Sequence, residues 1–349
     1  MKCLFFASIL FCCGLNGFDR VVLWGYKLHT HTHSYIHDAF YRAFKHLGYE
    51  VQWYDDNDTV NEEDFANSLF ISALVRSKNI PLRKDCLYIV HTNWSKDFSA
   101  NDTKFAPLIN QGHCVLLKCF QNEYLDAPEW EKLAPCLYRN IARRELAMPW
   151  ATDLLPFQID LEKERLKKIK PIKRIAFLGT IGKAGNGANY KELINFFRQG
   201  RSHGYSIKKN DPWSHPIPTL QMKNILQESM LAPAIQGKWQ VDVGYIPCRI
   251  FKNLSYGCLG ITNSERVWEL FNHKIVYDPD TKALFYKAEK ALKNYTLEKR
   301  FEMMDYIKYH HTYLNRIKAL LELLYDCCGD ESIKEAIENS NLVELPYHS

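Results

Sequence analysis

Apolar and polar positions in the first half of the chain follow two alternating patterns. Short apolar runs bounded by turn-forming residues predict strands, whereas apolar residues three or four positions apart predict helices. The helical pattern is clear over 35–47, where Ile36, Phe40 and Phe44 share one face and Gly48 provides a stop signal. The predicted elements are strand 20–25, helix 35–47, strand 50–54, helix 62–79, strand 86–91, helix 104–111 and strand 113–118. This alternation predicts a parallel, doubly wound sheet.

The second half continues the alternation around the stretch 244–280. Ile246-Pro247 disfavours helix, the spacing over 249–256 is helical, and Gly257 ends the pattern. The apolar run 258–262 then predicts a short buried strand. The other predicted elements are strand 175–180, helix 190–199, helix 219–229, strand 230–235, helix 265–271, strand 274–277 and helices 281–294 and 298–324. A second α/β domain follows from this order.

A charged stretch separates the two halves. Between Glu162 and Arg174 there are seven Lys or Arg residues against two Glu. Such a shift in composition is typical of a linker or of a solvated helix between domains, and 349 residues are enough for two domains. The expected limits are a leader at 1–17, a first domain at 18–160, a linker at 161–174, a second domain at 175–328 and an acidic tail at 329–349.

The leader, MKCLFFASILFCCGLNG, has one lysine, then an apolar run, then small residues. This order is typical of a secretory signal peptide, and the alternatives are an uncleaved anchor or a hydrophobic start. We therefore expect a secreted, periplasmic or membrane-associated protein whose leader could contact a membrane. A protein that acts on a mainly intracellular substrate would instead be expected in the cytoplasm.

Net charge and cysteine content exclude some functions. A formal charge of +5 is compatible with an anionic small ligand but is too weak to indicate nucleic acid as a partner. The 11 cysteines include no CxxC pair and no regular spacing, which indicates free thiols rather than a disulfide framework.

Two positions in the second half could bind an anion. Arg249, Lys252 and Asn253 lie at the start of a predicted helix, where free N–H groups and the helix dipole favour negative charge. Gly179 and Thr180 end a predicted strand, before a glycine-containing loop that can approach phosphates closely. These residues predict a phosphate or diphosphate site. The alternatives are an ordinary solvated helix turn and a flexible loop.

Histidines concentrate in the loop after the first predicted strand, with His29, His31, His33 and His37 inside nine residues. In an α/β protein such a loop lies at the edge of the sheet where ligands bind. His31 or His33 could act as a general base, because imidazole titrates near neutral pH. The cluster could also bind a transition metal, hydrogen-bond a phosphate, or form a polar loop that satisfies itself. It lacks a nearby cysteine and HExxH spacing, so we predict no metal site.

The segment RIFKNLSYGCLGITN, followed by VWELF and IVYDPD, resembles the donor-binding half of GT-B glycosyltransferases, close to the spore-maturation-protein-like, family 1 group. His311-Thr312-Tyr313 with Arg316 resembles the His-Thr-Tyr-x-x-Arg segment that opens the last helix of that family. The resemblance covers about 174–324. It implies two Rossmann-like domains facing a cleft, a nucleotide-diphosphate sugar as donor and no required cofactor. Lys252 stands where the family usually has a glutamate that binds the donor ribose.

The leading functional prediction is therefore transfer of a sugar from a nucleotide-diphosphate sugar to a hydroxyl of a glycan, lipid or protein acceptor. Gly179, Thr180, Arg249, Lys252 and Asn253 would bind the donor. Two alternatives stay open from the sequence. One is a sugar- or nucleotide-binding protein without catalysis, which Lys252 and the leader favour. The other is a metal-dependent hydrolase built on the histidine cluster.

Overall fold

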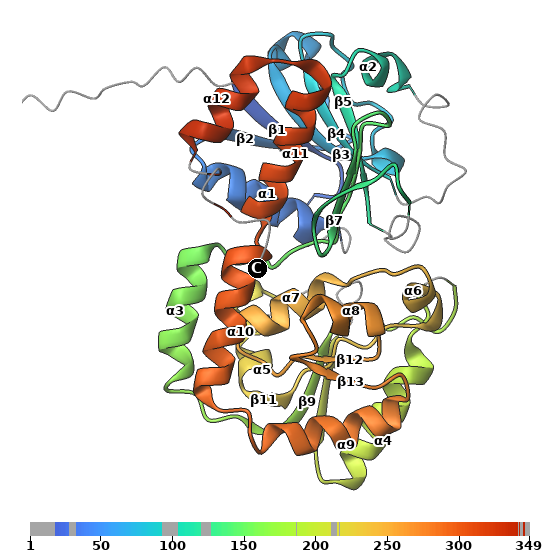
Figure 1. Cartoon of the computed structure of the whole chain (residues 1–349), viewed down its shortest axis with the longest axis vertical. Helices are drawn as coiled ribbons and strands as arrows, with labels where there is room; N and C mark the ends of the chain where they lie inside the picture. The colour runs from blue at the N-terminus through green and yellow to red at the C-terminus, as the bar shows by residue number, and fades with distance from the viewer. Residues whose placement is uncertain are drawn as a thin grey trace, which may run out of the picture.

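The computed structural model describes residues 18–27, 33–92, 104–119, 127–185, 187–210, 215, 217–340, 342 and 345. These residues form two α/β halves stacked along the long axis of the molecule (Figure 1). The histidines His29 and His31 lie outside the described residues, as does the leader. Within the described ranges, every helix is too short or too polar to span a bilayer.

The first half is built on one large sheet. Its strands are β1 (Arg20–Trp24), β2 (Glu50–Tyr54), β3 (Ser68–Ala73), β4 (Leu87–Thr92), β5 (Cys114–Lys118), β6 (Glu131–Ala134), β7 (Leu137–Asn140) and β8 (Glu145–Ala147). They pair in the order β2-β1-β3-β4-β5-β8-β7-β6. All pairs from β2 to β8 are parallel, which confirms the prediction, and the hairpin of β6 and β7 adds an antiparallel edge to the predicted parallel sheet.

Both faces of this sheet are buried. On one face lie α1 (Ser34–His46) and α11 (Tyr313–Cys328), packed on alternate strand residues such as Leu23 and Ile71. On the other lies α2 (Ala106–Asn110), packed on the intervening residues such as Phe70. Because successive side chains of a strand point to opposite faces, a sheet covered on both sides produces the continuous apolar runs seen in the sequence.

The helix predicted over 62–79 is wrong. This segment forms a 3₁₀ turn, η1 (Glu62–Phe65), then strand β3, then a second 3₁₀ turn, η2 (Leu74–Arg76). Asn67 has a φ of 49°, which interrupts any helix before β3. Leu69, Phe70 and Ile71 are all buried because β3 lies between β1 and β4. A short apolar run of this kind fits a central strand as well as a helix, and its place in the sheet decides between them.

The second half has smaller parallel sheets. Its strands are β9 (Ile172–Leu178), β10 (Ser206–Asn210), β11 (Ser229–Leu231), β12 (Ile261–Thr262) and β13 (Val276–Tyr277). They pair as β10-β9-β11 and β12-β13. Ala234 links the two sheets, because its N–H donates a hydrogen bond to the carbonyl of Ile261. The sequence analysis missed β10, whose segment SIKKN is polar and largely exposed because it lies at the sheet edge.

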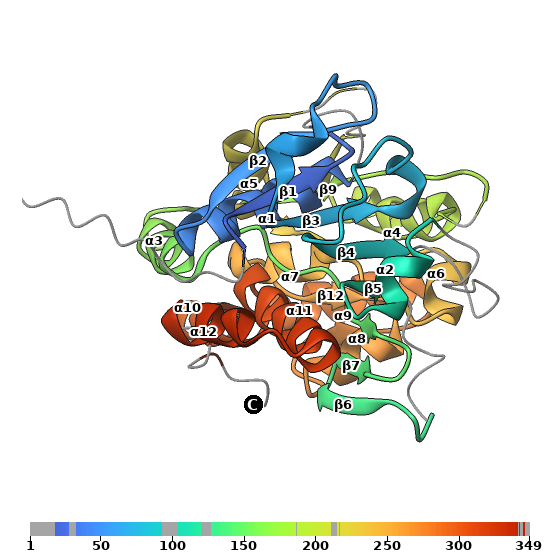
Figure 2. The same cartoon turned by 90° about the horizontal axis from the view of Figure 1, so that it is seen from above.

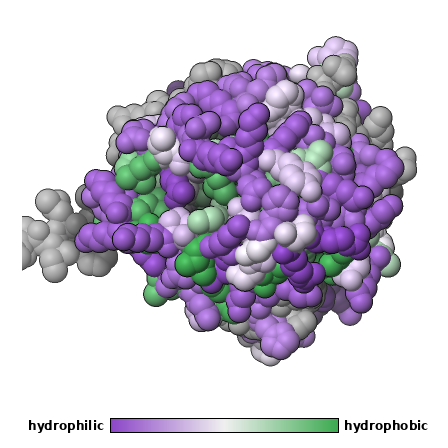
Figure 3. Space-filling model, turned by 90° about the horizontal axis from the view of Figure 1, so that it is seen from below, coloured by the Kyte–Doolittle hydropathy of each residue, from purple (hydrophilic) through white to green (hydrophobic). Residues whose placement is uncertain are grey.

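Helices surround these sheets, as Figures 1 and 2 show. They are α3 (Pro156–Leu166), α4 (Tyr190–Ser202), α5 (Thr219–Gln227), α6 (Lys238–Asp242), α7 (Cys248–Ser255), α8 (Glu265–Leu270), α9 (Thr281–Leu292) and α10 (Leu297–His310). The face seen from below is mostly hydrophilic, with smaller hydrophobic areas (Figure 3). Residues 160–174, which include the predicted linker, contain the end of α3 and the start of β9. Helix α3 packs along α10, and Lys308 of α10 forms an ion pair of 2.7 Å with Asp160 of α3.

The chain returns to the first half at its end. The single helix predicted over 298–324 is two helices, because Thr312 caps α11 through Asn315, whose Oδ1 accepts from the Thr312 N–H at 2.9 Å. The predicted acidic tail contains α12 (Glu331–Asn339), which buries Ile333 and Ile337 against α11. Helices α11 and α12 thus belong spatially to the first half (Figure 1).

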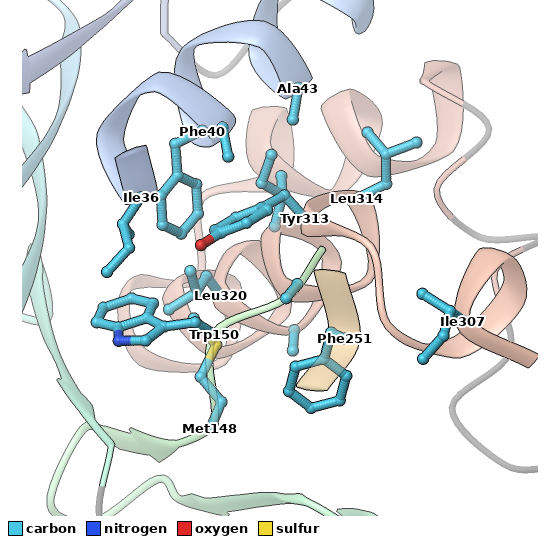
Figure 4. Close-up of a cluster of buried hydrophobic side chains, with 14 of the residues drawn as sticks. Ile36, Phe40, Ala43, Met148, Trp150, Phe251, Ile307, Tyr313, Leu314 and Leu320 are labelled. Carbon is cyan, nitrogen blue, oxygen red and sulfur yellow. The ribbon is translucent and has the colours of Figure 1, made fainter. Parts of the chain in front are cut away.

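The chain crosses between the halves at 148–155 and at 310–312. Arg316, fully buried, joins the two crossings: its Nε donates to the carbonyl of Pro149 at 3.0 Å and its Nη1 to that of His310 at 3.3 Å. Apolar side chains from both halves meet beside these crossings (Figure 4). Phe40 and Tyr313 come from the first half, with rings 4.7 Å apart, and Phe251 comes from the second. We therefore propose 151–312 as the second domain, with 313–340 completing the first.

Candidate active site

A cavity of about 250 Å³ lies between the two halves. The first half contributes Tyr35 and Ile36 from the start of α1 and Tyr313 from the start of α11. The second half contributes residues at the carboxyl ends of β9 and β10, among them Gly179 and Asn210, and the first turns of α7. The carboxyl ends of parallel strands and a helix N-terminus therefore meet at one cavity, which is where α/β proteins bind ligands.

Arg249 and Gly179, 70 positions apart in the sequence, lie against each other in this cavity. The Nε of Arg249 donates to the carbonyl of Leu178 at 3.3 Å, and its guanidinium lies 4.0 Å from the centre of the Phe177 ring. Gly179 has a φ of 149°, and a Cβ there would be 2.1 Å from Nη2 of Arg249. Gly179 therefore adopts a backbone conformation that other residues rarely adopt, and its lack of a side chain leaves room for the arginine.

Arg249 is a cation that forms no ion pair with the carboxylates of the described residues. Burial lowers the pKa of Arg249, although Cys248 and Tyr245 act in the opposite direction. The guanidinium nevertheless stays charged, because arginine does not lose its proton in proteins. No carboxylate in the part of the chain that the structure describes forms an ion pair with it. A desolvated, unpaired cation that lines a cavity is a strong candidate for binding an anion.

Lys252, one helical turn further along α7, is paired within the protein. Its Nζ lies 3.5 Å from Oδ2 of Asp153, and the two side chains are 14% and 4% exposed. Tyr256 donates its hydroxyl proton to the same carboxylate, at 2.8 and 2.9 Å from its two oxygens. Burial would raise the pKa of Asp153, but Lys252, Arg42 and Tyr256 outweigh it and the pKa falls below the ordinary value. Lys252 lines the cavity, with most of its charge already balanced.

Asn253 and Thr180 line the same cavity but are committed to the fold. The Nδ2 of Asn253 donates to the carbonyl of Ala232 at 2.7 Å and so holds α7 on the segment after β11. The carbonyl of Thr180 accepts from Nδ2 of Asn189 at 3.2 Å, at the start of the loop toward α4. The five predicted donor-binding residues thus lie around one cavity, with Arg249 the most available for a ligand.

The histidine cluster divides into different environments. His37 is buried and its Nδ1 lies 2.9 Å from the carbonyl of Gly25, which makes it a structural residue. His33 immediately precedes α1, so it lies two positions before Tyr35 of the cavity wall. Its ring stacks on Tyr26 at 5.1 Å and lies 5.3 Å from the ring of His91.

His91 extends this row of rings toward the second half. Its ring lies 4.7 Å from Trp150, and its Nε2 lies 3.3 Å from the sulfur of Cys119. Burial, followed by the nearby His33, His37 and Lys118, lowers the pKa of His91 well below its ordinary value, so this imidazole is neutral. The sequence placed His91 at a strand end, but only the fold brings it to His33.

Tyr245, which the sequence analysis missed, links this row to the cavity. It comes from the second half, between α6 and α7, and lines the cavity with Arg249. Burial raises the pKa of Tyr245, with Cys248 and Cys119 acting in the same direction, while Arg249 and a hydrogen bond with Trp150 oppose it. Tyr245 therefore contacts residues of both halves. The local sequence, GYIP, gives no signal of this contact.

The described residues contain no group of three or more His, Cys, Asp or Glu side chains arranged to hold a metal ion. The strand ends, the helix N-terminus and Arg249 instead describe a cavity for an anionic ligand, and the row of histidines lies beside it. Trp150, in the crossing at 148–155, contacts both His91 of this row and Tyr245 of the cavity wall.

Comparison with known proteins gives a result for the fold. No family model and no curated protein matches the sequence. Among solved structures, an alpha-glucosyltransferase in complex with UDP and a 13-mer DNA containing a central A:G mismatch has a TM-score of 0.54, at 10% identity over 87% of this chain and 99% of that one. The chain has the GT-B fold. An alpha-glucosyltransferase in complex with UDP and a 13-mer DNA containing a HMU base has a TM-score of 0.50, at 11% identity over 87% and 100% of the two chains.

The GT-B fold confirms the predicted architecture of two α/β units that face a cleft. Helices α11 and α12, at the end of the chain, complete the first of these units. At 10% and 11% identity the likeness concerns the fold alone, so the roles of individual residues depend on the geometry described above.

Proposed function

We propose that this protein is a glycosyltransferase of the spore-maturation-like group that transfers a sugar from a nucleotide-diphosphate sugar to an acceptor hydroxyl. The observation that carries the proposal is Arg249, a partly buried cation at the carboxyl end of β9, which no carboxylate of the described residues neutralises and which lines the cavity between the halves of a GT-B fold. It lies where a diphosphate would also meet the N-terminus of α7.

In the proposed reaction, the acceptor oxygen bonds to the anomeric carbon while the bond from that carbon to the diphosphate oxygen breaks. The leaving diphosphate takes the electron pair, and Arg249 stabilises the charge that develops on it. His33, two positions before Tyr35 of the cavity wall, is the candidate to receive the acceptor proton, and His31 stays a second candidate outside the described residues. Because Arg249 supplies the positive charge, the proposal requires no metal ion.

Gly179, Thr180 and Asn253 act in this proposal by shaping the donor side of the cavity. Lys252 adds a weaker positive field, since Asp153 already balances it. UDP is the first nucleotide to test, because both structural neighbours were solved with it. The acceptor could be a glycan, a lipid or a protein.

A binding protein without catalysis is the second candidate. The pairing of Lys252 with Asp153 favours it, because the position at which the resembling family has a ribose-binding glutamate is here occupied by a cation that is engaged in the fold.

Thermal unfolding with a panel of nucleotides and nucleotide sugars tests the donor site. A ligand that binds only the folded state raises the unfolding midpoint by mass action. We expect a clear rise with one nucleotide, and at least about tenfold weaker binding in Arg249→Ala, since a charged hydrogen bond is lost. Arg201→Ala, an exposed arginine at the end of α4, is the matched control and should bind like the parent.

Folded protein that responds to no nucleotide would refute the donor site. If a nucleotide binds, the release of nucleoside diphosphate from the corresponding nucleotide sugar should be measured in the parent and in His33→Gln. This measurement separates the transferase from the binding protein. Turnover that depends on His33 supports the transferase. Tight nucleotide-sugar binding with no turnover against a panel of glycan, lipid and protein acceptors supports the binding protein.

A further inference from the structure

The described part of the glycine-containing loop between β9 and α4 is held in place by hydrogen bonds. The side chain of Asn189 closes it on itself, since its Oδ1 accepts from the Gly182 N–H at 3.0 Å and its Nδ2 donates to the carbonyl of Thr180 at 3.2 Å. The loop is also pressed against the start of α6, because a Cβ on Gly237 would be 1.6 Å from the carbonyl oxygen of Ala188. This contact joins the loop and α6 into one unit.

That unit separates two hollows. Gly187 and Asn189 line the cavity between the halves, whereas Ala188 and Tyr190 line a second, open groove of about 490 Å³. Helix α6 divides in the same way, with Gln240 on the cavity side and its neighbour Trp239 on the groove side. The groove therefore lies directly behind the donor side of the cavity.

The groove combines aromatic surface with balanced charge. Trp239 is 38% exposed and Tyr190 is 40% exposed, although large aromatic side chains are usually more buried than this. Lys183 lies over the Tyr190 ring, with its Nζ 5.5 Å from the ring centre. Lys238 forms an ion pair of 2.9 Å with Asp242, and Lys191 and Glu192 complete the polar rim.

We propose that this groove binds a saccharide chain. Exposed tryptophan and tyrosine rings offer flat apolar surface to the C–H faces of sugar rings, while the surrounding carboxylates and ammonium groups hydrogen-bond to hydroxyls. Three lysines and two carboxylates line the groove, a balance that favours a neutral, polyhydroxylated ligand over a polyanion. Assignment of this saccharide as the glycosyl acceptor rests on the proposed function, whereas saccharide binding itself does not.

Affinity electrophoresis of the full chain through gels that contain soluble neutral polysaccharides tests the proposal. The panel should include α-glucans, β-glucans and soluble chitin derivatives, with heparin and single-stranded DNA as polyanions. We expect retardation by at least one neutral polysaccharide, reduced about tenfold or more in apparent affinity by Trp239→Ala and by Tyr190→Ala. Tyr309→Ala, a 49% exposed tyrosine on α10 outside the groove, should be retarded like the parent.

Three results would overturn the inference: no retardation by any neutral polysaccharide, retardation that both groove variants retain, or retardation by polyanions alone. Nucleotide binding measured on the same variants separates this result from the donor site. Trp239→Ala that loses polysaccharide binding but keeps its nucleotide response supports the groove independently, and Arg249→Ala should give the opposite pattern.

Discussion

Replacing Asp153 by asparagine tests whether Lys252 serves the junction between the halves. Asp153 lies in the crossing at 148–155 and Lys252 lies on α7, so their ion pair joins the crossing to the donor side of the cavity. The neighbouring Thr152 and Ser255 repeat this connection, with their hydroxyl oxygens 2.7 Å apart. Asparagine keeps the size of the side chain and can still accept from Tyr256, so the change removes the charge with little loss of packing.

The magnitude follows from the distance and the burial. Two unit charges at 3.5 Å attract by about 5 kcal/mol at an effective dielectric constant of roughly 20. Desolvation of both groups offsets much of this, but removal of one partner leaves the other charge buried and unpaired, which costs about 3–5 kcal/mol. We expect Asp153→Asn to lower the free energy of unfolding by about 3 kcal/mol, and Lys252→Met to lower it by a similar amount.

The double variant tests whether Asp153 and Lys252 are coupled, because it leaves neither charge unpaired. If the ion pair has the described role, the loss in Asp153→Asn/Lys252→Met is smaller than the sum of the single losses by about 2 kcal/mol. Equilibrium unfolding in urea, followed by circular dichroism, measures all four proteins. Additive losses would refute the coupling, and Lys252 would then be as available to a ligand as Arg249.

Three further predictions follow from the site and the crossings. Gly179→Ala should keep the fold but weaken nucleotide binding at least about tenfold in a thermal shift titration, because its Cβ displaces the Arg249 guanidinium. Burial lowers the pKa of His91 and of His311 well below 6.5, so both are neutral in the folded state. Below pH 6.5 the unfolded state binds a proton at each of these histidines, whereas the folded state does not. The free energy of unfolding should therefore decrease by about 1.4 kcal/mol for each pH unit below 6.5 and for each histidine, and it should decrease less steeply in His91→Gln. Arg316→Met should lower the urea midpoint sharply, by about 3 kcal/mol in free energy, because four carbonyl or imidazole contacts at the crossings are lost.

Much of the fold could be predicted because its elements carry local signals. The helix at 35–47 has a clear apolar stripe and a terminal glycine, and it appears as α1 at almost the same residues. The errors occur where tertiary position decides. The run Leu69–Phe70–Ile71 became a strand because it is central in the sheet, and the polar segment SIKKN became a strand because it is at an edge.

The candidate site was predictable on one side only. Arg249 and Gly179 each had a local reason to be chosen, namely a helix start and a strand end, and the fold brings those two places together. Tyr245 and Asp153 had none, because their roles depend on Trp150 and Lys252, which are distant in sequence. Pairing between halves leaves no periodic pattern, so a residue whose role is to contact the other half is not visible in its own segment.

The return of α11 and α12 to the first sheet has a consequence for biosynthesis. Helix α11 packs on β5, β8 and α1, so the first half lacks part of its apolar covering until residues 313–340 leave the ribosome. The second half, by contrast, is contiguous in the chain and can fold while that covering is still being translated. A nascent chain from which residues up to about 312 have emerged should therefore present an exposed sheet face to chaperones, beside an already folded second half.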